Sequence, residues 1–138
     1  MAHNTPLSDF PINIKLKLSA LWSAVMFCYI YGDYFQLYIP KQVEQFISGE
    51  TLLDSPVKLF LASVLMAVPA LMVFLSLILK PSVNRWLNIV FGTIYTGIMV
   101  LIAVNSIAPW WSFYLFLAII ESIITAMIAW QAWTWPRC

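Results

Sequence analysis

Four long apolar segments determine what this chain can fold into. A helix needs about 20 mainly apolar residues to cross a bilayer, and segments of this kind cover residues 18–39, 57–79, 86–107 and 110–135. The chain is 62% hydrophobic and 9% charged, whereas a soluble domain is about half apolar and about a quarter charged. We therefore predict an all-α integral membrane protein in which residues 1–138 form a single four-span domain.

Helix-ending residues separate the four segments. Pro40 closes the first segment because it has no amide hydrogen to donate. Asp54-Ser55-Pro56 is typical of an N-cap followed by proline at the first helical position. Lys80-Pro81-Ser82 and Ala108-Pro109 leave tight connections between the later segments. Short connections place consecutive helices antiparallel, which predicts an up-down-up-down four-helix bundle.

The connection over residues 41–55 is much longer than the other two. Within it, Val43, Phe46 and Ile47 would share one face of a short helix that Gly49 would end. Such a helix would lie along the membrane interface with its apolar face toward the lipid. An ordinary surface loop explains the segment equally well.

Basic residues predict the direction of the bundle, because cytoplasmic loops carry an excess of lysine and arginine. One side of the predicted bundle carries two basic residues, Lys41 and Lys58. The other side carries five, which are Lys15, Lys17, Lys80, Arg85 and Arg137. Both termini are therefore expected on the cytoplasmic side.

Tryptophans mark both ends of the last apolar segment. Trp111 and Trp130 would lie about 28 Å apart on a helix that rises 1.5 Å per residue, which is close to the thickness of the hydrocarbon core. Tryptophan prefers the two edges of a bilayer. We expect these residues to anchor the helix at the interfaces, and a stacking site for a ligand is the less favoured alternative.

Asp33 is an acid inside the first apolar segment, about 10 Å from its outer end. Intramembrane acids are rare and usually face the interior of a bundle or a polar cavity. Gly32 beside it would let another helix come close. The side chains that share its helical face are Trp22, Met26, Tyr29 and Gln36.

Glu121 is a second acid, near the middle of the last apolar segment. Tyr114 and Thr125 share its helical face, and Tyr95 falls at a similar depth in the third segment and could donate a hydrogen bond to it. The candidates for a ligand or proton site are Asp33, Glu121, Tyr29, Gln36, Tyr95 and Thr125. The alternative is structural, because an acid in a dry bundle can stay neutral and bond to a tyrosine, an asparagine or a backbone carbonyl.

Arg85 and Trp86 begin the third apolar segment, at the level of the lipid head groups. Arginine can bind a lipid phosphate there and tryptophan can anchor the helix, so these two residues are candidates for a head-group anchor. A plain topology signal is the more favoured interpretation.

Several classes of site are excluded by the residues that the chain lacks. His3 is its one histidine, and Cys28 and Cys138 are its two cysteines, so neither haem held by two histidines nor a metal site built from histidine and cysteine is expected. No cofactor is predicted. The basic residues form no cluster of the kind that binds nucleic acid.

Two runs of the sequence are distinctive, Asn84-Arg85-Trp86-Leu87-Asn88 and Trp130-Gln131-Ala132-Trp133-Thr134-Trp135. Together with Gly32-Asp33 and Glu121 they resemble a family of small prokaryotic four-span membrane proteins of unknown function, over nearly all of the chain after Lys15. The architecture of that family is broadly similar to that of the DoxX-like four-helix proteins. The resemblance implies a lone domain in a prokaryotic cytoplasmic membrane, and it brings no activity or substrate. Lys41 departs from the family pattern, in which glycine is expected after Pro40.

Three functions are compatible with these features. The most favoured is a non-enzymatic membrane module that binds a lipid-like ligand, a second copy of the chain or another membrane protein through its bundle. The alternative is an oligomeric proton- or cation-coupled transporter or channel subunit that uses Asp33 and Glu121, although no inverted repeat is evident. A lipid-modifying enzyme is least favoured, because the sequence shows no nucleophile–base pair and no glycine loop for phosphate.

Overall fold

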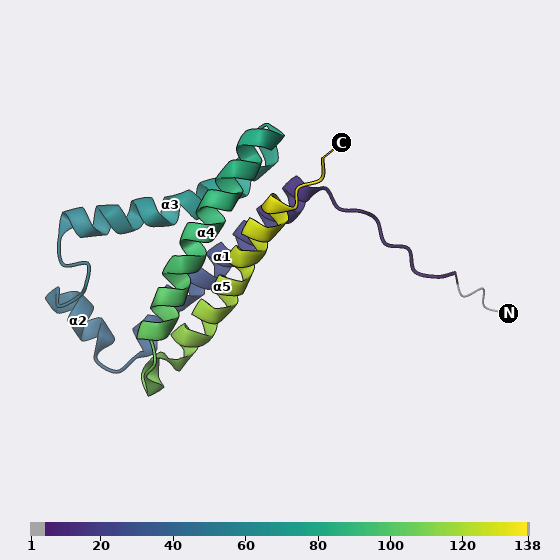
Figure 1. Cartoon of the computed structure of the whole chain (residues 1–138). Helices are drawn as coiled ribbons and strands as arrows, with labels where there is room; N and C mark the ends of the chain where they lie inside the picture. The colour runs from purple at the N-terminus through teal and green to yellow at the C-terminus, as the bar shows by residue number, and fades with distance from the viewer. Residues whose placement is uncertain (1–4, 138) are drawn as a thin grey trace.

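A computed structural model describes residues 5–137, a range that leaves out His3 and Cys138. Its four long helices are α1 (Ile14–Phe35), α3 (Pro56–Ile78), α4 (Pro81–Asn105) and α5 (Ser112–Trp133), joined by the shorter elements η1 (Gln36–Tyr38), α2 (Gln42–Ser48) and η2 (Pro109–Trp111) (Figure 1). The four long elements are long and apolar enough to cross a membrane by length and composition. No strand occurs between residues 5 and 137. The predicted all-α fold with four apolar spans is confirmed.

The helix ends follow from local capping. Ser55 caps α3 by accepting a hydrogen bond from the Lys58 amide at 3.3 Å, and Pro56 is the first helical residue, as predicted. The helix α1 begins earlier than predicted because the Asn13 side chain accepts from the Lys15 amide at 2.9 Å. The helix α4 also begins earlier, at Pro81 rather than Trp86, because proline is well tolerated in the first turn of a helix.

The connection after α1 contains the short helix α2, so the helical alternative is the correct one and the plain surface loop is not. Gly49 ends α2 with a φ of 78°, in the left-handed region that glycine adopts without strain. Lys41, at the start of α2, also has a positive φ of 64°. This is the position where the family resemblance leads us to expect glycine, and the left-handed backbone gives the physical reason.

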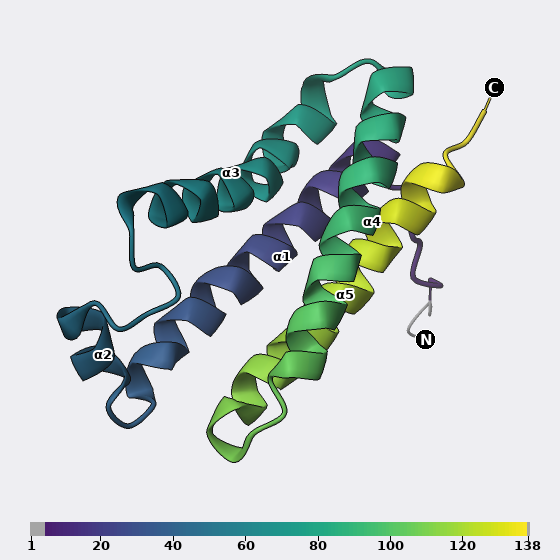
Figure 2. The same ribbon diagram turned by 60° about the vertical axis from the view of Figure 1, so that its left-hand side comes forward.

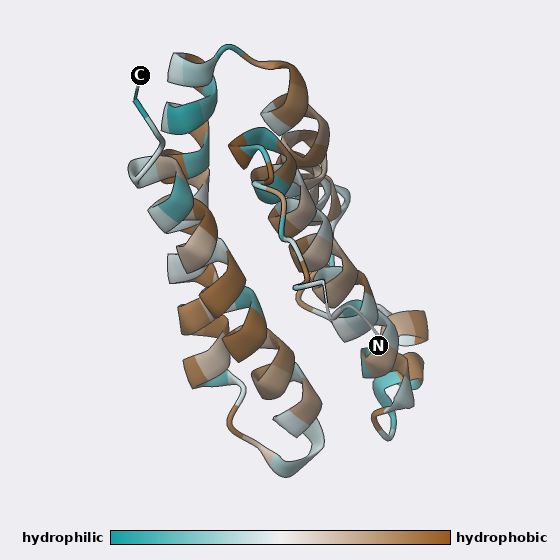
Figure 3. Ribbon diagram, turned by 90° about the vertical axis from the view of Figure 1, so that its right-hand side faces the viewer, coloured by the Kyte–Doolittle hydropathy of each residue, from teal (hydrophilic) through white to brown (hydrophobic). Residues whose placement is uncertain are grey.

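The long helices alternate in direction, and they pack in two pairs. The helix α1 lies between α3 and α5, and α4 packs along α5. The helices α3 and α4 share a very short connection but diverge from it, so that they touch mainly near that end (Figure 2). Hydrophobic residues predominate along the middle of the helices, while hydrophilic residues gather toward their ends (Figure 3).

The α4–α5 contact depends on a glycine. A Cβ atom at Gly92 would come within 3.0 Å of the Ala129 backbone nitrogen and 3.1 Å of the Thr125 carbonyl oxygen. Thr96 on α4 donates a hydrogen bond to the Thr125 hydroxyl on α5 at 2.8 Å. Small residues with hydroxyl pairs let helices approach closely in lipid, where no hydrophobic force drives them together.

Basic side chains cap the C-terminal ends of α3 and α5, which lie at the same end of the bundle. Lys15 Nζ donates to the Leu79 carbonyl oxygen, just after α3, at 2.8 Å. Arg85 Nε donates to the Ala132 carbonyl oxygen in the last turn of α5 at 3.1 Å. Cations are favourable there because the last carbonyls of a helix lack helical partners. Two of the residues that predict the topology therefore also complete helix ends.

A cluster of fully buried polar side chains joins α1, α3 and α4 at the same end. Trp22 Nε1 donates to the Asn88 Oδ1 atom at 2.8 Å, and the Ser76 hydroxyl donates to the same oxygen at 3.4 Å. Asn84 Nδ2 donates to the Ser76 carbonyl oxygen at 2.6 Å, and Asn88 Nδ2 donates to Asn84 Oδ1 at 2.7 Å. All four residues are 0% exposed. The two asparagines of the distinctive Asn-Arg-Trp-x-Asn run thus face the bundle interior.

We predict that the two glycines of α4 differ sharply in their tolerance of substitution. Gly92→Ala should lower the free energy of unfolding by about 1–3 kcal/mol, because the added methyl group must displace the backbone of α5. Gly97→Ala is the matched control, since a Cβ atom there meets nothing within 4 Å. Unfolding of both variants by titration with a denaturing detergent measures the difference. Equal stability of the two variants would contradict the close α4–α5 contact.

Candidate functional site

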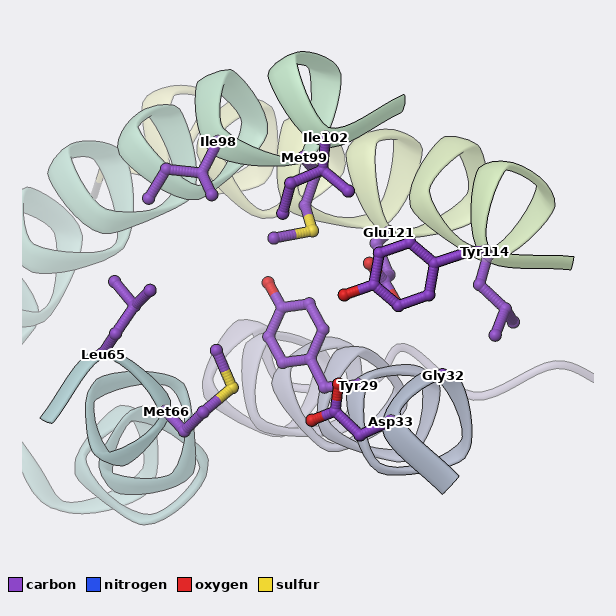
Figure 4. A pocket seen from close by; sticks show the side chains of 11 residues that line it. Tyr29, Gly32, Asp33, Leu65, Met66, Ile98, Met99, Ile102, Tyr114 and Glu121 are labelled. Carbon is purple, nitrogen blue, oxygen red and sulfur yellow. The ribbon is translucent and has the colours of Figure 1, made fainter. Parts of the chain in front are cut away.

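The four long helices enclose a cavity of about 70 Å³ between them (Figure 4). Its polar wall comes from α1 and α5, which contribute Tyr29, Asp33, Tyr114 and Glu121. Its apolar wall comes from α3 and α4, with Leu65, Met66 and Met99 among the side chains. The two acids predicted to lie inside the membrane, Asp33 on α1 and Glu121 on α5, thus line the same cavity although they are far apart in the sequence.

Tyr29 carries a fully buried polar atom that has no hydrogen-bond partner among the described residues. The residue is 6% exposed, and its hydroxyl is buried and has no hydrogen-bond partner within residues 5–137. Figure 4 shows this hydroxyl pointing into the cavity toward Met99. A buried hydroxyl without a partner is costly, so an unpaired group at this position indicates a place where another molecule can bond.

Glu121 lies beside Tyr29 and Tyr114 in the cavity wall. It is 5% exposed, and its carboxyl group makes no hydrogen bond to the part of the chain that the structure describes. No tyrosine hydroxyl or backbone group therefore pairs with this acid within residues 5–137.

Asp33 forms the edge of the cavity rather than its interior. Its residue is exposed, and its Oδ1 atom accepts a long hydrogen bond of 3.4 Å from Gln36 Nε2. Gly32, the preceding residue, packs against α5, and a Cβ atom there would make an ordinary van der Waals contact of 3.4 Å with the Tyr114 ring. The α5 helix does lie beside Gly32, as predicted, but its approach there does not depend on a glycine. Gln36 supports Asp33 at the rim and does not itself line the cavity.

Tyr95 has a different partner from the predicted one. Its hydroxyl donates to the Leu65 carbonyl oxygen of α3 and not to Glu121, so that prediction is wrong. Pro69 lies four residues after Leu65 and has no amide hydrogen, which leaves this carbonyl without a helical donor. Tyr95 supplies the missing hydrogen bond and packs edge-on against Trp22, with ring centroids 6.1 Å apart.

Thr125 shares the helical face of Glu121, as predicted, but serves helix packing. Its hydroxyl donates to the Glu121 carbonyl oxygen at 2.8 Å and accepts from Thr96. It is 0% exposed and lies in the α4–α5 contact. Thr125 is therefore placed next to the cavity without lining it.

Arg85 and Trp86 lie far from the cavity, at the end of the bundle where α5 finishes. The Arg85 guanidinium group caps α5 and lies 5.9 Å from the Trp86 ring and 6.0 Å from the Trp133 ring. Trp86 is 58% exposed, as expected of a residue at a membrane interface. Their role as a head-group anchor remains a prediction.

Several residues that matter here were not selected from the sequence. Tyr114 carried a usable signal, because it shares the helical face of Glu121. Asn84 and Asn88 also carried one, since two amides at i and i+4 in an apolar segment must share a buried face. Met66 and Met99 carried none, because an apolar segment does not reveal which of its sides faces a cavity.

The structure thus defines a multi-pass helical protein with an acidic cavity between its helices. The chain belongs to a family of unknown function, DUF6326, whose profile matches residues 8–137. No curated protein and no solved structure matches the chain. The resemblance to an uncharacterised family is confirmed.

We predict energetic coupling between Tyr95 and Pro69. Tyr95→Phe should lower the free energy of unfolding by about 0.6–2 kcal/mol, because the Leu65 carbonyl oxygen loses its donor. In a Pro69→Ala background the amide of residue 69 can bond to that oxygen, so the same substitution should cost less. A double-mutant cycle in detergent-denaturant titrations measures the coupling. An equal cost in both backgrounds would contradict the pairing.

Proposed function

We propose that this protein is a non-enzymatic membrane module that binds a lipid-like ligand, whose polar group enters the cavity beside Tyr29. The observation that carries the proposal is the buried Tyr29 hydroxyl, which has no partner within residues 5–137 and points into the cavity. The Glu121 carboxyl group in the same wall is a second free hydrogen-bonding group. A ligand with a polar head would pair with both groups.

The shape of the cavity supports a ligand that enters from the lipid. A volume of about 70 Å³ admits a small polar group, but it is too small for a chain of a dozen carbon atoms. The rim is open, because Asp33 and Leu65 are both exposed there. Since α3 diverges from α4 on this side, an apolar tail can remain between these helices in contact with lipid.

A proton- or cation-coupled transporter subunit is the second candidate, and the meeting of Asp33 and Glu121 in one cavity supports it. Such a protein would carry a pH-dependent flux in liposomes that Glu121→Gln abolishes. Flux that is unchanged in this variant would remove Glu121 from the mechanism.

The proposed location is the cytoplasmic membrane of a prokaryote, with both termini in the cytoplasm. An excess of basic residues at the end of the bundle where α1 starts and α5 finishes supports this orientation. A reporter enzyme that is active in the cytoplasm alone, fused after residue 137, should be active. An active reporter in the loop that contains α2 would instead show the opposite orientation.

A photolabelling experiment tests the ligand-binding proposal. Diazirine-bearing probes with a twelve-carbon tail and an alcohol, carboxylate or ammonium head are added to the protein in lipid nanodiscs, and labelled peptides are mapped. We expect at least one probe to label the segment around Met66 or Met99. Leu65→Trp at the rim should reduce this labelling several-fold because the larger ring blocks entry.

The matched control for the rim variant is Leu71→Trp. Leu71 lies on the same helix and is 53% exposed, but it does not line the cavity. This variant should label as the unmodified protein does. Labelling that is spread evenly over the lipid-facing surface, or that is equal in the two variants, would contradict the proposed site.

A further inference from the structure

The polar groups of the cavity share one chemical property, which is that all of them can accept hydrogen bonds. The Tyr29 hydroxyl oxygen and the carboxyl oxygens of Asp33 and Glu121 are acceptors, and the sulfur atoms of Met66 and Met99 are weak ones. Among the described residues, no lysine, arginine, tryptophan or amide side chain lines the cavity. The best complement to such a wall is a group that donates several hydrogen bonds.

Within residues 5–137, neither acid of the cavity forms an ion pair with a basic side chain. Lys15 and Arg85 are held at helix ends by the carbonyl oxygens that they cap. Lys58 forms an ion pair of 2.7 Å with Asp54 in the loop before α3. A carboxylate inside a membrane needs a positive partner or a proton, and the basic residues all lie toward the ends of the bundle.

Aromatic rings complete this environment. Tyr29 on α1 and Tyr114 on α5 line the same polar wall of the cavity as the Glu121 carboxyl group (Figure 4). The face of a tyrosine ring attracts a cation within about 6 Å, and the attraction is stronger where water is excluded. A wall that combines carboxyl groups with tyrosine rings is well suited to an ammonium group.

We infer that the ligand of this cavity is a cationic amphiphile with a primary ammonium head, an inference that rests on the proposed function. The ammonium N–H groups donate to the Tyr29 oxygen and to the carboxyl groups of Glu121 and Asp33. An ammonium group is compact, so it fits a cavity of about 70 Å³. The alkyl tail leaves along the apolar side chains of α3 and α4.

An ammonium group can come from a free amine or from the head group of phosphatidylethanolamine. The geometry favours the free amine, because Glu121 lies about 15 Å along its helix from the interfacial Trp111. A phospholipid head group would also bring its phosphate next to two acids, and like charges repel. We therefore assign the site to a single-chain amine without a phosphate.

Competition for photolabelling tests the assignment. Dodecylammonium, dodecanol and dodecanoate, which share one tail, compete with the labelling probe in phosphatidylcholine nanodiscs. Dodecylammonium should compete at a concentration about tenfold lower than the other two, since charge-assisted hydrogen bonds are the stronger ones. Glu121→Gln should weaken competition by dodecylammonium about tenfold and leave dodecanol unchanged.

Glu44→Gln is the matched control, because Glu44 is exposed on α2 and its substitution should change no competition. Asp33→Asn is the second variant, to be used if Glu121→Gln fails to fold.

Equal competition by the three compounds, or no effect of both cavity variants, would overturn the assignment of a cationic ligand without contradicting the binding site itself. Absence of cavity labelling by every probe would overturn the proposed function itself. Competition by added phosphatidylethanolamine would overturn the assignment of a free amine and would indicate a lipid head group as the ligand.

Discussion

The buried hydrogen-bonded cluster of Trp22, Ser76, Asn84 and Asn88 is the constraint on which the rest of the bundle depends. Lipid tails are as apolar as the helix surfaces, so burial of apolar side chains does not by itself decide which helices meet in a membrane. Amide groups do decide it, because they are costly to leave unpaired away from water. This cluster binds α1, α3 and α4 to one another at one end of the bundle.

The cavity begins where these polar contacts end. Along α3, the Ser76 contacts come first, followed by the Val73 carbonyl oxygen that accepts from Ser19 at 2.7 Å and the Leu65 carbonyl oxygen that accepts from Tyr95. Beyond Leu65 no side-chain hydrogen bond joins α3 to another long helix within the described residues. The helix α3 diverges from α4 from their connection onward, and Met66, the residue after Leu65, lines the cavity together with the acids and tyrosines of α1 and α5. The same contacts that fix the bundle therefore set the position of the candidate site.

The sequence predicts where the helices begin and end better than it predicts which side of each helix faces the cavity. Segment length, prolines and caps predicted the four helices, and Gly49 predicted the end of α2, because these are local properties of the chain. Asp33, Tyr29 and Glu121 were candidates for a site because polar groups are costly in lipid. Whether their side chains meet in one cavity depends on how each helix is rotated about its axis, which the sequence does not reveal. Depth along a helix suggested a Tyr95–Glu121 pair. The structure shows the Leu65 carbonyl oxygen as the partner of Tyr95 instead, because Pro69 has no amide hydrogen to donate to that oxygen.

An experimental structure in lipid nanodiscs, at a resolution that shows bound molecules, tests the central claim most directly. We expect density that belongs to no residue of the chain within hydrogen-bonding distance of the Tyr29 hydroxyl and the Glu121 carboxyl group, with α3 still separated from α4. A collapsed cavity, in which α3 packs against α4 and the Tyr29 hydroxyl bonds to a group of the protein itself, would contradict it. In that case both acids would be structural, and the bundle would hold no ligand at this site.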